Sequence, residues 1–234
     1  MMIIVTDAHV SKARGNDTEF FQMLAAIEST EQDLIFLGDI FDLWIALPRY
    51  ETDIHNDFIS WCREQKKNRT IGFLEGNHEY YLAKQRAEAF TWCSNDAWRQ
   101  DDAGTLYVHG DQINRQDKNY LRFRKLSNNS IAKYILRSLP FGPKIADSIK
   151  KGLKKTNKQY RLQLPWDEII FFADNRFAEG IDTIFMGHFH QEYCYDNQES
   201  KKIYLLPDWL GTQKVTLFQK NPLKISTIPW RELL

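Results

Sequence analysis

The amino-acid sequence predicts a layered α/β fold. Apolar runs typical of buried strands alternate with segments of helical spacing, in the order strand, helix, strand, helix. One helix is expected over residues 17–30, and a second contains Ile54, Phe58 and Trp61. Each of these helices lies before an apolar run that ends at a glycine, Gly38 and Gly76 respectively. Alternation of this kind indicates helices that pack on sheets.

Five of the apolar runs are followed, directly or after one glycine, by Asp, Asn or His. The runs are residues 2–6, 34–37, 70–75, 105–108 and 182–186. In open α/β sheets, ligands bind at the edge formed by the carboxyl ends of the strands. A glycine at such a position, as in Gly38-Asp39, lets the backbone turn and lets neighbouring chain approach closely. The polar side chains are therefore expected to converge on one rim.

The polar side chains at this rim are the candidate metal ligands, and all of them are oxygen or imidazole donors. They are Asp7, His9, Asp39, Asn77, His109, His188 and His190. In extended backbone, Asp7 and His9 would project to the same side because they are two residues apart. Mixed carboxylate and imidazole ligation suits Mn²⁺, Fe or Zn²⁺.

Seven ligands are too many for one tetrahedral ion, so the sequence predicts two divalent metal ions that share Asp39. Mn²⁺ is the first expectation, with Fe or Zn²⁺ as alternatives. Two ions roughly 3.5–4 Å apart can activate a bridging hydroxide and hold the oxygens of a phosphoryl group during in-line displacement. The sixth histidine, His55, lies on the helix of Ile54 and Trp61 and is interpreted as structural.

The rest of the chain supplies further expected elements. A helix follows over residues 81–90, a strand pair spans 98–108, and another helix runs from 166 to 178. Three strands are then expected to form an antiparallel tail. They cover residues 203–206, 214–218 and 223–229.

Residues 113–162 form a basic segment between two of the site strands. They contain fourteen Lys or Arg against two acids, a formal charge of +12 in a chain whose total is zero. Helical spacing is visible at Ile131, Tyr134, Ile135 and Leu139, and again at Ile145, Ile149 and Leu153. We interpret residues 113–162 as a basic helical lid inserted within a single domain of residues 1–234.

The bulk composition favours an ordinary globular protein. The 234 residues are 43% hydrophobic and 26% charged, and the formal net charge is zero, which argues against a dedicated polyanion-binding protein. The three cysteines are far apart and form no metal-binding pattern, as expected in a reducing compartment. No apolar run reaches the ~18 residues of a spanning helix. The expected location is therefore cytoplasmic, with peripheral contact to the inner face of a membrane.

The order of the motifs resembles that of the calcineurin-like metallophosphoesterases. Those motifs are Asp-x-His, Gly-Asp-x-x-Asp, Gly-Asn-His-Glu, His-Gly-Asp and Gly-His-x-His. The resemblance implies an α/β sandwich of two mixed sheets flanked by helices. It also implies that Asp7, His9, Asp39 and His190 hold one metal ion, and that Asp39, Asn77, His109 and His188 hold the other. His78 would be a catalytic residue that is not a ligand, contacts the phosphate and assists the leaving group.

A narrower resemblance is to the bacterial UDP-2,3-diacylglucosamine pyrophosphohydrolases of lipid A synthesis. It rests on Gly38-Asp39-Ile40-Phe41-Asp42-Leu43-Trp44, on the spacing of Asp117, Tyr120, Phe123 and Arg124, and on Pro207-Asp208-Trp209. It implies a nucleotide-linked lipid substrate that is cleaved to UMP and a lipid phosphate, with Asp117, Tyr120 and Arg124 as substrate-binding residues. The chain departs from that family at His78, where well-known members carry Arg.

Two other functions remain open at the level of sequence. A phosphodiesterase or nuclease could use the basic lid to follow a nucleic-acid backbone, but single-strand binders interleave exposed aromatic residues and this lid is mostly aliphatic. A catalytically inactive scaffold of the same fold should have lost ligands, and all seven are present. The expected partners are thus a nucleotide-linked or lipid-linked phosphate and an anionic membrane surface, with nucleic acid as the less favoured alternative.

Overall fold

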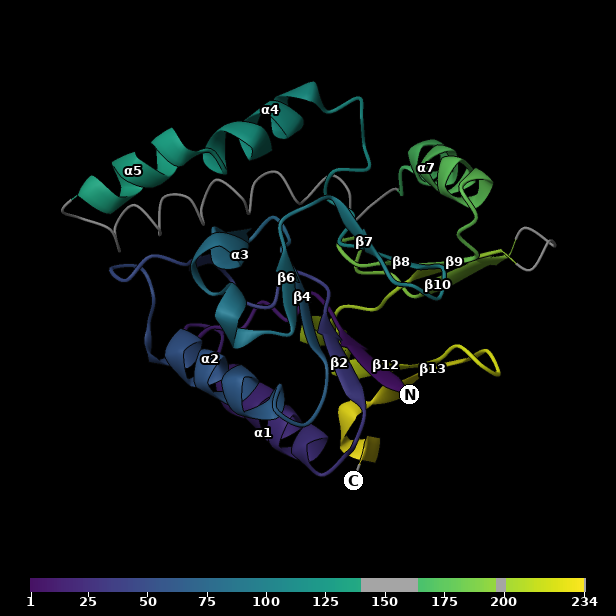
Figure 1. Cartoon of the computed structure of the whole chain (residues 1–234), viewed down its shortest axis with the longest axis horizontal. Helices are drawn as coiled ribbons and strands as arrows, with labels where there is room; N and C mark the ends of the chain where they lie inside the picture. Colours follow the sequence, from purple (N-terminus) through teal and green to yellow (C-terminus); the bar gives the residue numbers. More distant parts are fainter. Residues whose placement is uncertain (140–163, 197–200, 234) are drawn as a thin grey trace.

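The protein is built around two β-sheets that face each other, each covered on its outer side by helices (Figure 1). The computed structural model describes residues 1–139, 164–196 and 201–233. A minor two-stranded sheet, formed by β3 (Trp44–Ile45) and β5 (Glu79–Tyr80), completes the described strands. This arrangement is the α/β sandwich that the motif order implies.

The larger sheet has six described strands in the order β13-β12-β1-β2-β4-β6. Their bounds are β1 Met2–Val5, β2 Asp33–Phe36, β4 Ile71–Leu74, β6 Trp92–Ser94, β12 Lys214–Gln219 and β13 Lys224–Pro229. Strands β1, β2, β4 and β6 run parallel to one another, whereas β12 pairs antiparallel with both β1 and β13. The carboxyl ends of β1, β2 and β4 therefore meet at one edge.

The smaller sheet has five described strands in the order β10-β11-β9-β8-β7. Their bounds are β7 Trp98–Gln100, β8 Thr105–Val108, β9 Thr183–Met186, β10 Tyr193–Asp196 and β11 Lys202–Leu205. Strands β8 and β9 are parallel and deliver the residues that follow Val108 and Met186 to the same edge. The pairing of β7 with β8 confirms the expected strand pair.

The side chains of each strand alternate between two cores, as a period of two requires. Ile3 and Val5 of β1 face helices α1 (Asp17–Glu28) and α2 (Asp53–Gln65), while Ile4 faces the second sheet. Helix α7 (Trp166–Ala178) covers the outer face of the smaller sheet. The expected helices over 17–30 and 166–178 are thus present, and His55 lies buried on α2, where it caps the helix through Thr52 and stacks on Trp44.

Two expectations about local structure are wrong. The helix expected over 81–90 is broken into α3 (Leu82–Gln85) and a 3₁₀ turn, η1 (Ala87–Ala89), because Arg86 leaves helical backbone angles with φ −136° and pairs with Glu51. In the tail, β11 does not join β12; it lies parallel to β9 in the other sheet. The chain crosses between the sheets through the short helix α8 (Trp209–Thr212) before the antiparallel β12–β13 hairpin and a final 3₁₀ turn, η2 (Trp230–Leu233).

Helices α4 (Lys118–Ser127) and α5 (Ser130–Ser138) lie in the described part of the basic segment and run along the upper left of Figure 1. Asn129 separates them and caps α5. The second helix expected in the lid, with Ile145, Ile149 and Leu153, lies outside the described residues. Within the described ranges, no helix combines the length and the apolarity needed to cross a membrane.

The carboxylate of Glu79 ties two rim loops together from inside the protein. The side chain is fully buried, and its Oε2 accepts hydrogen bonds from the backbone N–H of Asp39 (2.8 Å) and of Gly76 (2.8 Å). Its Oε1 accepts from the N–H of Ile40 (2.9 Å) and of Phe41 (3.4 Å). One side chain thus fixes the loop after β2 against the loop after β4.

Replacing Glu79 by Gln is expected to destabilise the fold strongly. The amide NH₂ would face two backbone N–H donors, and each buried donor left unsatisfied costs about 1–3 kcal/mol. The free energy of unfolding, measured by urea denaturation, should fall by about 2–6 kcal/mol. The matched control is Glu64→Gln, which removes an exposed ion pair with Lys67 and should change the free energy by less than about 1 kcal/mol. Similar small effects of both substitutions would contradict the role given to Glu79.

Candidate metal centre

The loops that follow β1 and β2 run side by side beyond the ends of the strands. The N–H of Asp7 donates to the carbonyl of Gly38 (3.0 Å), and the N–H of His9 donates to the carbonyl of Asp39 (2.9 Å). The expected extended backbone at Asp7 and His9 is wrong, because their φ angles are +52° and +44°. Both side chains reach the rim through left-handed backbone.

Left-handed backbone recurs at five of the seven candidate ligands. Besides Asp7 and His9, the others are Asp39 (φ 54°), His188 (φ 68°) and His190 (φ 53°). Non-glycine residues adopt such angles uncommonly, and each costs about 1–3 kcal/mol that the surrounding structure must outweigh. Concentrated strain of this kind is typical of functional sites.

Gly38 and Gly76 allow the rim loops to approach one another. A Cβ atom at Gly38 would lie 2.4 Å from Nδ1 of His109 and 2.8 Å from the Cα of Gly76. A Cβ at Gly76 would lie 2.3 Å from Oδ1 of Asp39. The glycines of the two motifs are therefore required by close contact between the loops that carry the candidate ligands.

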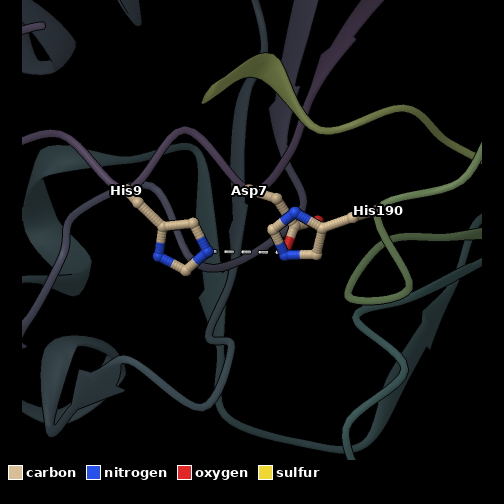
Figure 2. Close-up of side chains that lie close together, drawn as sticks. All are labelled: Asp7, His9 and His190. Atoms are coloured by element: carbon tan, nitrogen blue, oxygen red, sulfur yellow. Dashed lines mark ion pairs between the residues drawn. The ribbon is translucent and has the colours of Figure 1, made fainter. Parts of the chain in front are cut away.

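Asp7, His9 and His190 form the first group of candidate ligands (Figure 2). The Asp7 Oδ2 accepts from the Thr6 hydroxyl (2.7 Å) and from the N–H of His188 (2.8 Å), which leaves Oδ1 directed at the two imidazoles. The distance from Asp7 Oδ1 is 3.4 Å to Nε2 of His190 and 4.0 Å to Nε2 of His9. The two rings stack at an angle of 11°.

Asp39, His109 and His188 form the second group. The Nε2 of His109 lies 3.4 Å from Oδ1 of Asp39 and 3.3 Å from Oδ1 of Asn77, and its Nδ1 lies 2.9 Å from the carbonyl oxygen of Leu37. The Oδ2 of Asp39 also lies 3.8 Å from Nε2 of His9, a member of the first group. The structure thus brings all seven candidates together, with Asp39 between the two groups.

Buried carboxylates that lie close to one another, and buried polar atoms without hydrogen-bond partners, make this cluster suited to cations. Among the described residues, Asp7 Oδ1, Asp39 Oδ2 and His9 Nε2 are buried without a hydrogen-bond partner. Burial, together with the negative charges of Glu79 and Asp7, raises the pKa of Asp39 well above its usual value. Bound cations would relieve both the repulsion and the missing contacts. The donor set therefore fits divalent metal ions.

Burial favours the neutral form of two histidines of the cluster, His9 and His188, and a neutral imidazole has a lone pair to offer a metal. Burial, with the rings of His78 and His190 next, lowers the pKa of His9 well below its usual value. Burial is also the main cause that lowers the pKa of His188 to about 3. A neutral imidazole is the form in which histidine binds a metal ion.

His78 lies beside the cluster with one ring nitrogen unpartnered. Its Nδ1 is 2.6 Å from the carbonyl oxygen of Asp42, and its Nε2 is 3.8 Å from Oδ2 of Asp39 and has no hydrogen-bond partner within the described chain. Burial lowers its pKa to about 4. His9, Asp42 and His78 also lie close enough together to form a third possible ligand group.

The sequence did not single out two carboxylates that support the cluster. The first, Asp42, forms an ion pair with Arg14 at 2.9 Å. The second, Asp208, lies 3.3 Å from Nδ1 of His190. Burial alone would raise the pKa of Asp208, but the hydrogen bond from His190 leaves it below its usual value. Asp42 belongs to the Gly-Asp-x-x-Asp motif and Asp208 to Pro207-Asp208-Trp209. Only the fold shows which side chains these two carboxylates contact.

The three predicted substrate-binding residues lie along α4, from its N-cap, Asp117, to Arg124 in its last turn. Asp117 caps the helix by accepting from the N–H of Tyr120 (2.9 Å), and the Tyr120 hydroxyl donates to Asp111. Arg124 is 3% exposed; it donates to the carbonyl oxygens of Gly76 (2.5 Å) and Glu79 (3.1 Å) and pairs with Asp111 at 3.4 Å. These contacts fasten α4 to the rim loop that carries Asn77 and His78.

Comparison with known proteins places the chain among phosphoesterases. Residues 2–192 match the family described as calcineurin-like phosphoesterase. The chain is 24% identical to the UDP-2,3-diacylglucosamine hydrolase of Shewanella piezotolerans, over 97% of this chain and 98% of the relative. It is 26% identical to the UDP-2,3-diacylglucosamine hydrolase of Pseudomonas fluorescens, over 89% of this chain and 87% of the relative.

Among solved structures, vacuolar protein sorting 29 from Cryptosporidium parvum aligns over 97% of this chain and 95% of its own, with a TM-score of 0.40 and 8% identity. The family match spans the strand ends from Asp7 to His190, which hold the candidate ligands. The chain therefore belongs to the calcineurin-like phosphoesterase family and is a metal-dependent phosphoesterase.

Proposed function

We propose that the protein binds two divalent metal ions and hydrolyses the pyrophosphate of a nucleotide-linked lipid of the UDP-2,3-diacylglucosamine type. The observation that carries the dinuclear site is the pair of ligand groups that meet at Asp39. Asp7, His9, Asp39 and His190 would hold one ion, and Asp39, Asn77, His109 and His188 the other. Mn²⁺ is our first choice of metal, because three of the seven ligands are oxygen donors, which Mn²⁺ accepts beside imidazole nitrogens.

The reaction is a hydrolysis in which water adds to one phosphorus and one P–O bond of the pyrophosphate breaks. The products are UMP and the lipid phosphate. When bound, the two ions supply a lowered pKa for the attacking water and positive charge against the phosphoryl oxygens. The protein itself supplies a rim whose donors are held in place before substrate arrives, by Glu79 and by the left-handed loops.

We assign His78 the catalytic contact with the phosphate. Its Nδ1 is occupied by the carbonyl of Asp42, so the ring is oriented with Nε2 toward the cluster. A ring nitrogen without a partner, next to Asp39, is available to exchange a hydrogen bond or a proton with a substrate oxygen. Well-known members of the narrower family carry Arg at the position of His78. The imidazole of His78 can make the phosphate contact in place of that Arg.

The basic segment is proposed as a lid over the acyl chains, extending through residues 113–162. Two observations support the described half of it. Arg124 and Tyr120 fix α4 against the rim loops, so the segment begins directly beside the metal centre. Asp117, Tyr120 and Arg124 are accordingly proposed to serve substrate binding by setting the position of α4.

The outer faces of α4 and α5 are proposed to contact an anionic membrane surface. Their most exposed apolar side chains are Leu126 (62%), Ile131 (71%) and Tyr134 (73%), and basic residues lie between them, including Lys125 and Lys133. None of the α5 side chains is buried, so the apolar residues of this helix add little to the core. Attraction of each Lys or Arg to an anionic surface is worth about 1 kcal/mol, and apolar insertion adds to it.

Asp39→Asn tests the shared ligand. The amide is neutral and binds cations poorly, so both metal equivalents should weaken together and turnover should fall by orders of magnitude. Metal content after dialysis and hydrolysis of a diester substrate provide the two measurements. Asp33→Asn, at the opposite end of β2, keeps an acceptor for the Thr70 N–H and should leave both readings unchanged. Two tightly bound ions and a normal rate in the Asp39→Asn variant would rule out the shared role.

His78→Ala tests the assignment of a catalytic residue that is not a ligand. Metal content should stay at the wild-type value, while the rate should fall by about 10²–10⁴-fold on an unactivated substrate. The loss should shrink on a nitrophenyl ester, whose leaving group needs little protonation. Loss of one metal equivalent would instead make His78 a ligand, as the proximity of His9 and Asp42 allows.

The double substitution Ile131→Ser and Ile135→Ser tests the membrane surface. Both residues are exposed, at 71% and 51%, so the fold should persist. Binding to phosphatidylglycerol vesicles at low salt and turnover of a diacylated substrate should both fall, while turnover of a small diester should not. The control, Leu223→Ser, removes a similarly exposed apolar side chain from the β12–β13 turn. Equal losses on both substrates, or salt-sensitive binding of single-stranded nucleic acid, would favour a nuclease instead.

A further inference from the structure

Asp208 lies at the crossing point between the two sheets, immediately before α8. Its Oδ2 is 3.3 Å from Nδ1 of His190 and accepts from the N–H of Gly211 at 2.8 Å. One oxygen of the carboxylate therefore makes two contacts. It caps the single turn of α8, and it contacts the His190 imidazole at the nitrogen that faces away from Asp7.

The segment that carries Asp208 is fastened to the same loop as Asp7. The N–H of Trp209 donates to the carbonyl of Thr6 (3.0 Å), and the N–H of Leu210 donates to the carbonyl of Asp7 (3.2 Å). The indole of Trp209 is 1% exposed and packs edge-on against Phe20 with centroids 5.5 Å apart. Asp208 is thus held in a fixed position relative to the β1 loop.

We infer that Asp208 is a positioning residue that keeps the Nδ1 proton on His190 and so directs the Nε2 lone pair toward Asp7 and the first metal ion. The inference rests on the proposed function, because it assigns His190 as a ligand. A carboxylate on the far nitrogen fixes both the tautomer and the orientation of a metal-binding imidazole, and it makes the ring more basic.

The neighbouring rings show why a carboxylate matters at this position. His109 and His78 have their Nδ1 atoms against backbone carbonyl oxygens, of Leu37 and Asp42, which cannot move independently of the loops. Both ring nitrogens of His9 lack a hydrogen-bond partner within the described chain, and its ring is stacked on His190 with centroids 5.5 Å apart. The orientation of His190 therefore also restrains His9, and Asp208 acts on both rings of the first group.

Two substitutions separate this role from helix capping. Asp208→Ser keeps a hydroxyl that can cap α8 but is too short to reach His190. Asp208→Asn keeps the size and an acceptor but removes the charge. In both variants, titration calorimetry with Mn²⁺ should show one of two binding events weakened by about 10–100-fold, with the other unchanged. Asp182→Asn, at the amino end of β9 and far from the rim, should match wild type.

A second readout does not involve metal. In the metal-free wild-type protein, the ¹⁵N shifts of the His190 imidazole should report protonation at Nδ1, and in Asp208→Ser the ring should shift toward protonation at Nε2. Mn²⁺ affinities within twofold of wild type in both variants, or an unchanged tautomer in Asp208→Ser, would overturn the inference. So would a lowered melting temperature with unchanged affinity, since that is the result of lost capping alone.

Failure of the proposed function would look different. A wild-type protein that binds two Mn²⁺ ions without hydrolysing any phosphoester would refute the proposed function and leave the role of Asp208 standing on the calorimetry. A wild-type protein that binds no Mn²⁺ would refute both the dinuclear site and the metal-directed part of the inference.

Discussion

The buried carboxylate of Glu79 is the contact on which the geometry of the candidate metal centre depends. Its two oxygens collect four backbone N–H groups from the loops that present Asp39 and Asn77. Arg124 contacts the same region through the carbonyls of Gly76 and Glu79. The Glu79 carboxylate thus accepts hydrogen bonds from the N–H groups of the loops, and the Arg124 guanidinium donates hydrogen bonds to their carbonyls. The candidate ligand side chains of these loops can therefore face the rim.

The same arrangement that orders the candidate ligands also destabilises the folded state locally. Asp7, Asp39 and Glu79 place three carboxylates in a buried region, and five of the seven candidate ligands have left-handed backbone. A folded protein can maintain such a site only if the sheets beneath it are well packed, and the cores on both faces of β1 and β2 meet that need. Divalent cations would lower the electrostatic part of the cost, so binding of metal and stability of the fold should be coupled.

Much of the fold follows from patterns that act over short distances. The apolar runs at 2–6, 105–108 and 182–186 became β1, β8 and β9, and helical spacing located α1 and α7, because alternation of 2 and of 3.6 reflects one buried face. Two short strands were not predicted from the sequence. β6 has only three residues, too few for a pattern, and most side chains of β10 are exposed. The partner of β11 was also missed, since sequence periodicity indicates that a strand exists and not where it pairs.

The sequence by itself determined which side chains stand at the strand ends, since apolar runs that stop at Asp, Asn or His fix the order of the seven candidates along the chain. Only the tertiary structure decided how they face one another. Asp7 and His9 reach the rim through positive φ angles that no local pattern predicts. Asp208 meets His190 although eighteen positions of sequence and the strands β10 and β11 separate the two residues. Contacts of this kind arise from the packing of the two sheets, which brings distant loops to one edge.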